Sequence, residues 1–462
     1  MNAKRTALAA SCLLLQLHLF AQSNVSAWNA NPALKLDWPL FDLPYQLAAM
    51  NTVGHGFFSS YANPSMAQSL AVTQNVYSSF HYGMKYFFDN SSSLDYTLRT
   101  VIYWGGTWLG NYLFGWMPGG DGWLHEEYHR AVMSRFETNS FNDMNLFPIG
   151  SSVVSVSKVA DSDLIRMKKE NPYDFIRMHV AGIEGQYLLV NSLQRDNFYY
   201  NQNLLNEIVY WLTTLNAHLY VLMSASDEND AQTETMNKEE TDMASRDFTG
   251  FDFNAWVYDL FKPHEPYEER GVHPSGVGIS RYRSSGDLTE EELRYLKLHG
   301  NLQMLNYLSP MMFGIRSFPL GDSGYDMNFA MRHYLTSFGA DIAANVFLKT
   351  GAFKMAFSLH NYVNYHNYFP AIEAELIDYQ VYIGRLGLYV SPRLLIGMQP
   401  KDQEFKTSSP EFLGLFGLRI DFMASRYFLP YLDFTAKTDG WVAGNEYLSA
   451  NVSIRLGVSM RF

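Results

Sequence analysis

Three residues in one short stretch have the types and the spacing that metal-dependent hydrolysis requires. His125 and His129 are four positions apart in the sequence GWLHEEYHR, and Glu126 follows the first histidine directly. On a helix, residues four apart lie on one face, so their imidazoles can bind the same metal ion. Glu126 then lies near the metal and can accept a proton from a bound water. The stretch predicts a metal centre with His125 and His129 as ligands and Glu126 as general base.

This H-E-x-x-H pattern resembles the signature of the zincins, which implies Zn2+ as the cofactor and a hydrolase as the activity. A zinc site needs a third protein ligand, and Glu184 in HVAGIEGQYLL is the expected one, because it is an ionisable residue among small and apolar neighbours. A glutamate on a downstream helix resembles the gluzincin type of metallopeptidase. The match is partial, since Leu188 stands where some of these families have an aspartate. His179 is the second candidate for this ligand.

A helix without a metal is the alternative interpretation of the same residues. Glu126 and Arg130 are four apart and could form an exposed salt bridge of about 0.3–0.5 kcal/mol. Asp121 is expected to cap the start of this helix, after a glycine pair. Further along the chain, a proline- and glycine-rich stretch contains His264, Glu265 and His273. It is expected to be a surface loop that could reach over a site.

Residues 1–27 read as a signal peptide. Lys4 and Arg5 precede the apolar run ALAASCLLLQLHLF, which is too short to span a bilayer. Cys12 is the only cysteine, so the rest of the chain can provide no disulfide and no thiolate ligand. With a formal net charge of −12 and no basic block, the chain is not expected to bind nucleic acid.

The last third of the chain, residues 311–462, alternates apolar and polar residues. The final run NVSIRLGVSMRF alternates without a break and ends on Phe462, and similar runs cover 341–349, 352–363, 386–398 and 411–424. Long alternating strands with a terminal phenylalanine resemble bacterial outer-membrane β-barrels. The resemblance implies an antiparallel transmembrane barrel of about eight strands, located in the cell outer membrane, with lipid and the barrel-assembly machinery as partners. An additional strand is possible at residues 54–61.

Residues 28–310 instead show helical periodicity. We expect helices at 66–88, 94–114, 172–194, 203–223 and 288–308, with Asn171 and Pro172 starting the third and Asp287 or Thr289 capping the last. The acidic segment 226–247 is expected to be a mobile loop. The predicted fold class is therefore α+β: a mainly helical, zincin-like domain followed by a C-terminal antiparallel β-barrel.

Three functions fit these features. The leading hypothesis is an outer-membrane-anchored zinc hydrolase, most simply a metallopeptidase acting on a peptide or protein. The second is a non-enzymatic outer-membrane protein for transport, adhesion or assembly, with a helical module. The third is a lipid hydrolase of the barrel itself, because Ser358 and His360 lie two apart on one strand face.

Overall fold

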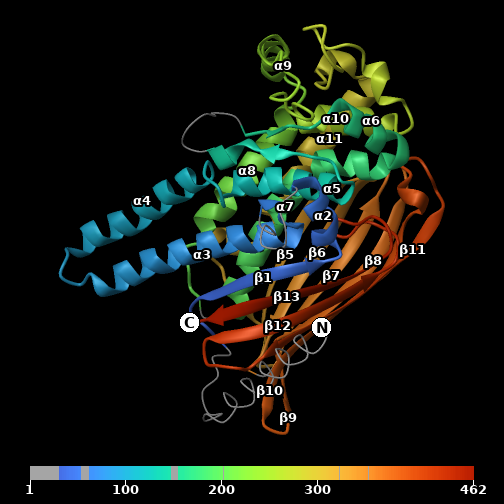
Figure 1. Ribbon diagram of the computed structural model, residues 1–462. Helices are drawn as coiled ribbons and strands as arrows, with labels where there is room; N and C mark the ends of the chain where they lie inside the picture. The colour runs from blue at the N-terminus through green and yellow to red at the C-terminus, as the bar shows by residue number, and fades with distance from the viewer. Residues whose placement is uncertain (1–30, 54–61, 147–153, 201, 322, 352) are drawn as a thin grey trace, which may run out of the picture.

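The protein is an α+β structure in which a curved antiparallel sheet holds helices on its inner side (Figure 1). The computed structural model describes residues 31–53, 62–146, 154–200, 202–321, 323–351 and 353–462. The expected signal peptide, residues 1–27, and the possible strand at 54–61 lie outside these ranges. In the described part, no helix is both long and apolar enough to cross a membrane.

In the residues described, the main sheet has eleven strands, whereas about eight were expected. Its strands follow the order β1-β13-β12-β11-β10-β8-β7-β6-β5-β4, with β9 paired to β10. Over the described ranges the sheet is not closed, because β1 and β4 lie at its two edges. The strands are β1 Lys35–Leu43, β4 Phe318–Pro319, β5 Asp326–Thr336, β6 Gly339–Lys349, β7 Lys354–Val363, β8 Tyr368–Ile377, β9 Tyr379–Ile383, β10 Leu386–Pro400, β11 Pro410–Phe422, β12 Phe428–Lys437 and β13 Asn451–Arg461. The first strand comes from the region expected to be helical and pairs with the last.

The alternation of the strands is inverted relative to that of a water-soluble sheet. On β13, Val452, Ile454 and Leu456 are exposed, whereas Ser453 and Ser459 on the opposite parity are buried. The same holds across the sheet, where the exposed apolar side chains include Phe329, Phe357, Leu359, Ile372, Leu394, Ile396, Phe412 and Phe416. The polar parity therefore faces the enclosed helices, and the apolar parity faces outward.

Ten α-helices are described: α2 Tyr45–Val53, α3 Met66–Asn90, α4 Tyr96–Phe114, α5 Asp121–Arg135, α6 Asp161–Glu170, α7 Pro172–Tyr199, α8 Glu207–Met223, α9 Asp227–Glu239, α10 Asp252–Phe261 and α11 Glu290–Leu302. The five expected helices are all present. Pro172 begins α7 as predicted, and Thr289 caps α11 with a capping box. Short elements complete the helical part: β2 Phe141–Asn142, β3 Val156–Ser157, and the 3-10 turns η5 Gln303–Tyr307 and η6 Pro310–Phe313.

The acidic segment 226–247, expected to be a loop, instead contains α9. Ser226 caps this helix by accepting a hydrogen bond from the Asn229 amide. Asp227, Glu228 and Asp230 lie in its first turn, where negative charge is favourable at a helix N-terminus. Helix signals at the ends therefore outweigh the absence of apolar residues in the middle.

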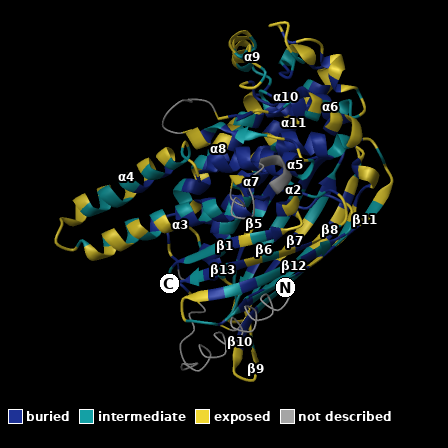
Figure 2. Cartoon of the chain, viewed as in Figure 1, coloured by how far each residue is buried: buried dark blue, intermediate teal, exposed yellow. Residues whose placement is uncertain are grey.

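Burial is greatest where α5 and α7 pack together inside the sheet (Figure 2). Helix α7 also reaches the sheet, since Arg195 forms a 2.6 Å ion pair with Glu375 of β8. In contrast, α4 and α9 are largely exposed (Figure 2).

Candidate metal centre

Helix α5 carries the H-E-x-x-H residues and is buried on nearly every side, including its polar residues. It begins at Asp121 after Gly120, so Asp121 is the first helical residue and not the expected cap. The Asp121 carboxylate instead accepts hydrogen bonds from the hydroxyls of Tyr77 at 3.1 Å and Thr213 at 3.0 Å. These contacts tie the start of α5 to α3 and α8.

His125 and His129 turn their Nδ1 atoms toward α7. The Nδ1–H of His129 donates to the carbonyl of Met178, and that of His125 donates to Oε1 of Gln186 at 3.2 Å. A metal-binding histidine commonly donates its second ring N–H in this way, which fixes the ring and its tautomer. In these tautomers the Nε2 atom of each ring carries the free lone pair.

Asp252 completes the group. Its Oδ2 lies 3.0 Å from Nε2 of His125 and 3.5 Å from Nε2 of His129. Ligand atoms around a tetrahedral zinc ion are about 3.3 Å apart, given bond lengths near 2.0–2.1 Å. Among the described residues, His125, His129 and Asp252 form the one cluster of three potential metal ligands, with all ligand atoms within 4.8 Å of one another.

Glu184, the third ligand expected from the sequence, is not part of this cluster. Its carboxylate accepts hydrogen bonds from Arg177 at 2.9 Å, from the Gly444 amide at 2.7 Å and from the Trp441 indole at 3.3 Å. The reason is helical geometry. Gly182 is the residue of α7 that faces His125, and Glu184 lies two positions later, about 200° around the helix.

The glycines of α7 let the two helices approach closely. A Cβ on Gly182 would lie 2.3 Å from Nε2 of His125, and one on Gly185 would lie 2.9 Å from the Tyr128 ring. This close approach brings the histidines against α7. The candidate ligands come from α5 and α10, however, and α7 provides the hydrogen-bond acceptors.

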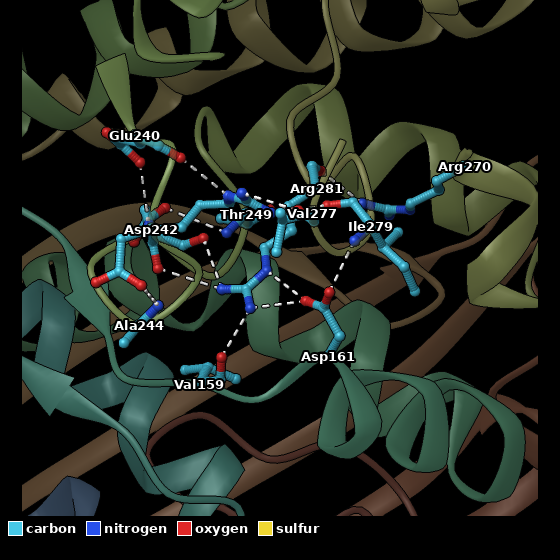
Figure 3. A network of polar contacts seen from close by, with 12 residues as sticks. Val159, Asp161, Glu240, Asp242, Ala244, Thr249, Arg270, Val277, Ile279 and Arg281 are labelled. Atoms are coloured by element: carbon cyan, nitrogen blue, oxygen red, sulfur yellow. Dashed lines mark hydrogen bonds and ion pairs between the residues drawn. The ribbon is translucent and has the colours of Figure 1, made fainter. Parts of the chain in front are cut away.

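A buried arginine holds the chain segment that leads to Asp252 (Figure 3). Arg281 donates two hydrogen bonds to Asp161 at the start of α6, at 2.9 and 2.7 Å. It also donates to the carbonyls of Val159, Arg246 and Asp247. Figure 3 shows the guanidinium between Asp161 and the Val159 carbonyl. Arg281 thus fixes the backbone five residues before Asp252.

The Asp247 carboxylate extends this support. It accepts hydrogen bonds from the amides of Val156, Thr249 and Gly250. The backbone amide of Asp252 donates to the hydroxyl of Tyr220, at 3.3 Å, and the Tyr220 ring lies against His125. The third ligand position is therefore set by contacts from several elements.

Glu126 is buried beside the cluster, and its carboxyl has no hydrogen-bond partner among the described residues. Burial raises the pKa of Glu126 well above its usual value, and the neighbouring His129 opposes that effect. The predicted salt bridge between Glu126 and Arg130 is wrong: Arg130 pairs with Glu127, at 2.7 Å, and this pair is buried.

The geometry of the cluster suits a proton or a metal ion placed among His125, His129 and Asp252. Because both Nδ1 atoms donate to fixed acceptors, each neutral ring presents its Nε2 lone pair to the Asp252 carboxylate. A lone pair and a carboxylate repel each other unless a proton or a metal ion lies between them. Nε2 of His129 is buried and has no hydrogen-bond partner in the described structure. Burial lowers the pKa of His129, but Asp252 outweighs it and raises that pKa to about 9. These donors fit a divalent ion such as zinc.

The other candidate residues lie elsewhere. His179, the alternative third ligand, is bonded to Asp259 at 2.9 Å and to the Thr249 hydroxyl. His264 is exposed, and His273 is buried in its own loop, where it contacts Ser275. Glu265 accepts a hydrogen bond from Tyr258.

Ser358 and His360 do not bond to each other. The Ser358 hydroxyl donates to Asn345 at 2.7 Å, and His360 Nδ1 pairs with Asp341 at 2.8 Å. The hydroxyl hydrogen that a serine nucleophile would pass to a histidine is therefore directed at an amide instead.

Asp252 was missed because it has the ordinary signal of a helix start. It follows the glycine-containing turn FTGF and lies in the first turn of α10, where acidic residues are common. Nothing in the local sequence separates such a residue from a ligand.

Comparisons with known proteins return no match: no family model fits the chain, and no curated protein or solved structure is significantly similar to it.

Proposed function

We propose that this chain is a zinc-dependent hydrolase, most simply a peptidase, anchored in a bacterial outer membrane. The proposal is supported chiefly by the convergence of two Nε2 atoms on the Asp252 carboxylate, with both Nδ1 atoms already bonded to α7. His125, His129 and Asp252 would hold the ion, and Asp252 takes the place that the sequence suggested for Glu184.

The residues of the proposed site have different roles in hydrolysis. A zinc ion held by these three residues would supply Lewis-acid polarisation of a carbonyl. Glu126 lies next to His125 on the buried helix, and its carboxyl has no hydrogen-bond partner among the described residues, so it would accept a proton from a water beside the cluster. Tyr220, beside His125 and bonded to the Asp252 amide, fixes the orientation of both.

The membrane location is supported by the inverted alternation of the sheet. A row of apolar side chains outside and polar side chains inside is what a transmembrane barrel presents to lipid. We infer that the strands form a barrel wall that is inserted by the barrel-assembly machinery, with α7 packed on its inner side.

Metal analysis of the detergent-purified protein tests the site. Wild type is expected to hold one zinc per chain, and His129→Ala and Asp252→Asn are expected to lose it. Glu184→Gln separates the two candidates for the third ligand, and it is expected to retain the metal. His264→Ala, which changes an exposed histidine, is the matched control. Zinc retained by Asp252→Asn but lost by Glu184→Gln would overturn the assignment.

Glu126→Gln tests the activity separately. This variant keeps the size of the side chain and is expected to bind zinc normally. Its hydrolysis of a fluorogenic peptide library should fall at least about 100-fold, the usual contribution of a general base. If wild type and Glu126→Gln bind zinc equally and neither hydrolyses peptides, the metal serves a non-enzymatic outer-membrane protein instead.

A further inference from the structure

Helices α3 and α4 form a hairpin that projects sideways from the body of the protein (Figure 1). Only Thr107 and Asn111 of α4 are buried. Its exposed face carries Trp104, Trp108 and Tyr112, and Trp116 follows just after its end, each about half exposed. Figure 2 shows the exposure along this helix. A projecting helix of this kind buries little apolar surface in its own fold, so these side chains need another apolar environment.

Helix α8 continues this surface. It contacts α4, and its outer face exposes Trp211, Leu215, Leu219 and Leu222. Residues 100–120 contain no Asp, Glu, Lys or Arg, and neither do residues 208–226. The charged residues of the hairpin, Lys85, Asp89, Asp95 and Arg99, gather near its tip. Uncharged apolar faces with Trp and Tyr are typical of surfaces that contact lipid.

The edges of the open sheet provide an independent observation. At one edge, Asn75 of α3 pairs with both backbone groups of Asp37 in β1: its Oδ1 accepts from the amide at 3.0 Å, and its Nδ2 donates to the carbonyl at 2.7 Å. Gln68 of α3 donates to the carbonyl of Pro39 at 3.1 Å. Amide side chains of a helix here take the place of a neighbouring strand.

The other edge is paired in the same way where β5 extends beyond the short strand β4. Asn306 of η5 accepts from the amide of His333 in β5 at 2.9 Å and donates to its carbonyl at 3.4 Å. The next amide along this edge, that of Met331, donates to the carbonyl of Leu308 at 2.9 Å. Water would solvate a free edge, whereas hydrocarbon cannot, so pairing of this kind is required where a sheet edge approaches lipid.

We propose that the α3–α4 hairpin and the outer face of α8 lie in the same bilayer as the outward face of the sheet. The helices cover the opening between β1 and β5, and lipid acyl chains surround strands and helices alike. This inference rests on the proposed membrane location, and it adds that the lipid-facing surface is partly helical.

Depth-dependent quenching of a small fluorophore tests it. Bimane is attached to single cysteines in a Cys12→Ser background, and the protein is reconstituted in phosphatidylethanolamine–phosphatidylglycerol vesicles with spin-labelled acyl chains. Trp108→Cys reports on α4, Leu215→Cys on α8 and Leu359→Cys on the outward face of β7. Glu234→Cys on the exposed helix α9 is the control in water.

We expect the spin labels to quench bimane at positions 108 and 215 as strongly as at 359, and not at 234. Quenching at 359 alone overturns the inference but leaves the membrane location intact. No quenching at any of the four positions overturns both. If neither the spin labels nor aqueous iodide quenches bimane at positions 108 and 215, a protein partner or a second copy covers the hairpin. That result also overturns the inference.

Discussion

Replacing Arg281 with methionine removes the side chain that fixes the segment before Asp252. Arg281 is fully buried and donates five hydrogen bonds, two to the Asp161 carboxylate and three to backbone carbonyls. Methionine fills a similar volume without the charge. The Asp161 carboxylate then keeps the Ile279 amide, at 2.7 Å, but loses its cation.

The expected loss of stability is large. Breaking a buried ion pair by removing one partner costs about 3–5 kcal/mol, because the other charge stays buried and uncompensated. Adding Asp161→Asn removes that stranded charge, so the double variant should be less destabilised than the sum of the two single variants, by about 2 kcal/mol. Since the backbone before Asp252 is loosened, zinc affinity should also fall by at least about tenfold.

Urea unfolding followed by tryptophan fluorescence measures the first effect, and competition with a zinc-sensitive dye measures the second. Arg294→Met on the exposed face of α11 is the matched control and should change stability by less than about 0.5 kcal/mol. If Arg281→Met lowers the free energy of unfolding by less than about 1 kcal/mol, as an exposed ion pair would, Arg281 does not hold the segment before Asp252.

Two further substitutions test the packing of α7 and the burial of a histidine. Gly182→Ala places a methyl group against His125, so it should lower the free energy of unfolding by about 1–3 kcal/mol and abolish zinc binding. Gly83→Ala, in open space on α3, is the control and should be neutral or stabilising. Equal zinc content in both variants would contradict the proposed contact. Burial lowers the pKa of His299 to about 3, below its unfolded value near 6.5, so its stabilising effect is complete above the unfolded pKa and is lost as the pH falls. Through this residue, the free energy of unfolding of the wild type should fall by about 2 kcal/mol between neutral pH and about pH 5, as measured by urea unfolding. A His299→Phe variant whose stability falls as steeply with pH would show that His299 is not responsible.

The strands were predictable because alternation is a local property of the sequence. The parity of Val452, Ile454 and Leu456 identified both the strand and its apolar face. The way the sheet ends was not predictable, because it depends on contacts across the whole chain. β1 pairs Lys35 with Arg461, and its sequence, KLDWPLFDL, contains a proline that obscures a strand pattern but suits an edge strand.

The site shows the same division between local and distant contacts. His125 and His129 lie four apart on one helix, so their proximity followed from helical geometry alone. Glu184 was expected to bind the metal because it is ionisable among small and apolar neighbours, but its partner is Arg177, seven residues earlier on the same face of α7. An arginine two turns away compensates the charge of a buried glutamate, so burial of the glutamate does not by itself indicate a metal. Asp252 could be placed only by the fold.

Helix α7 connects the two halves of the protein through its opposite faces. Toward α5 it offers Gly182, Gln186 and the Met178 carbonyl, which set the positions of both histidines. Its other face offers Glu184, which binds the Gly444 amide in the segment between β12 and β13. A helix held by buried contacts on both faces transmits a displacement from one to the other, since close-packed interiors deform little. Glu184 is therefore one of the contacts, together with the Arg195–Glu375 ion pair, that fix α7 on the sheet side of the protein, while Asp252 completes the site.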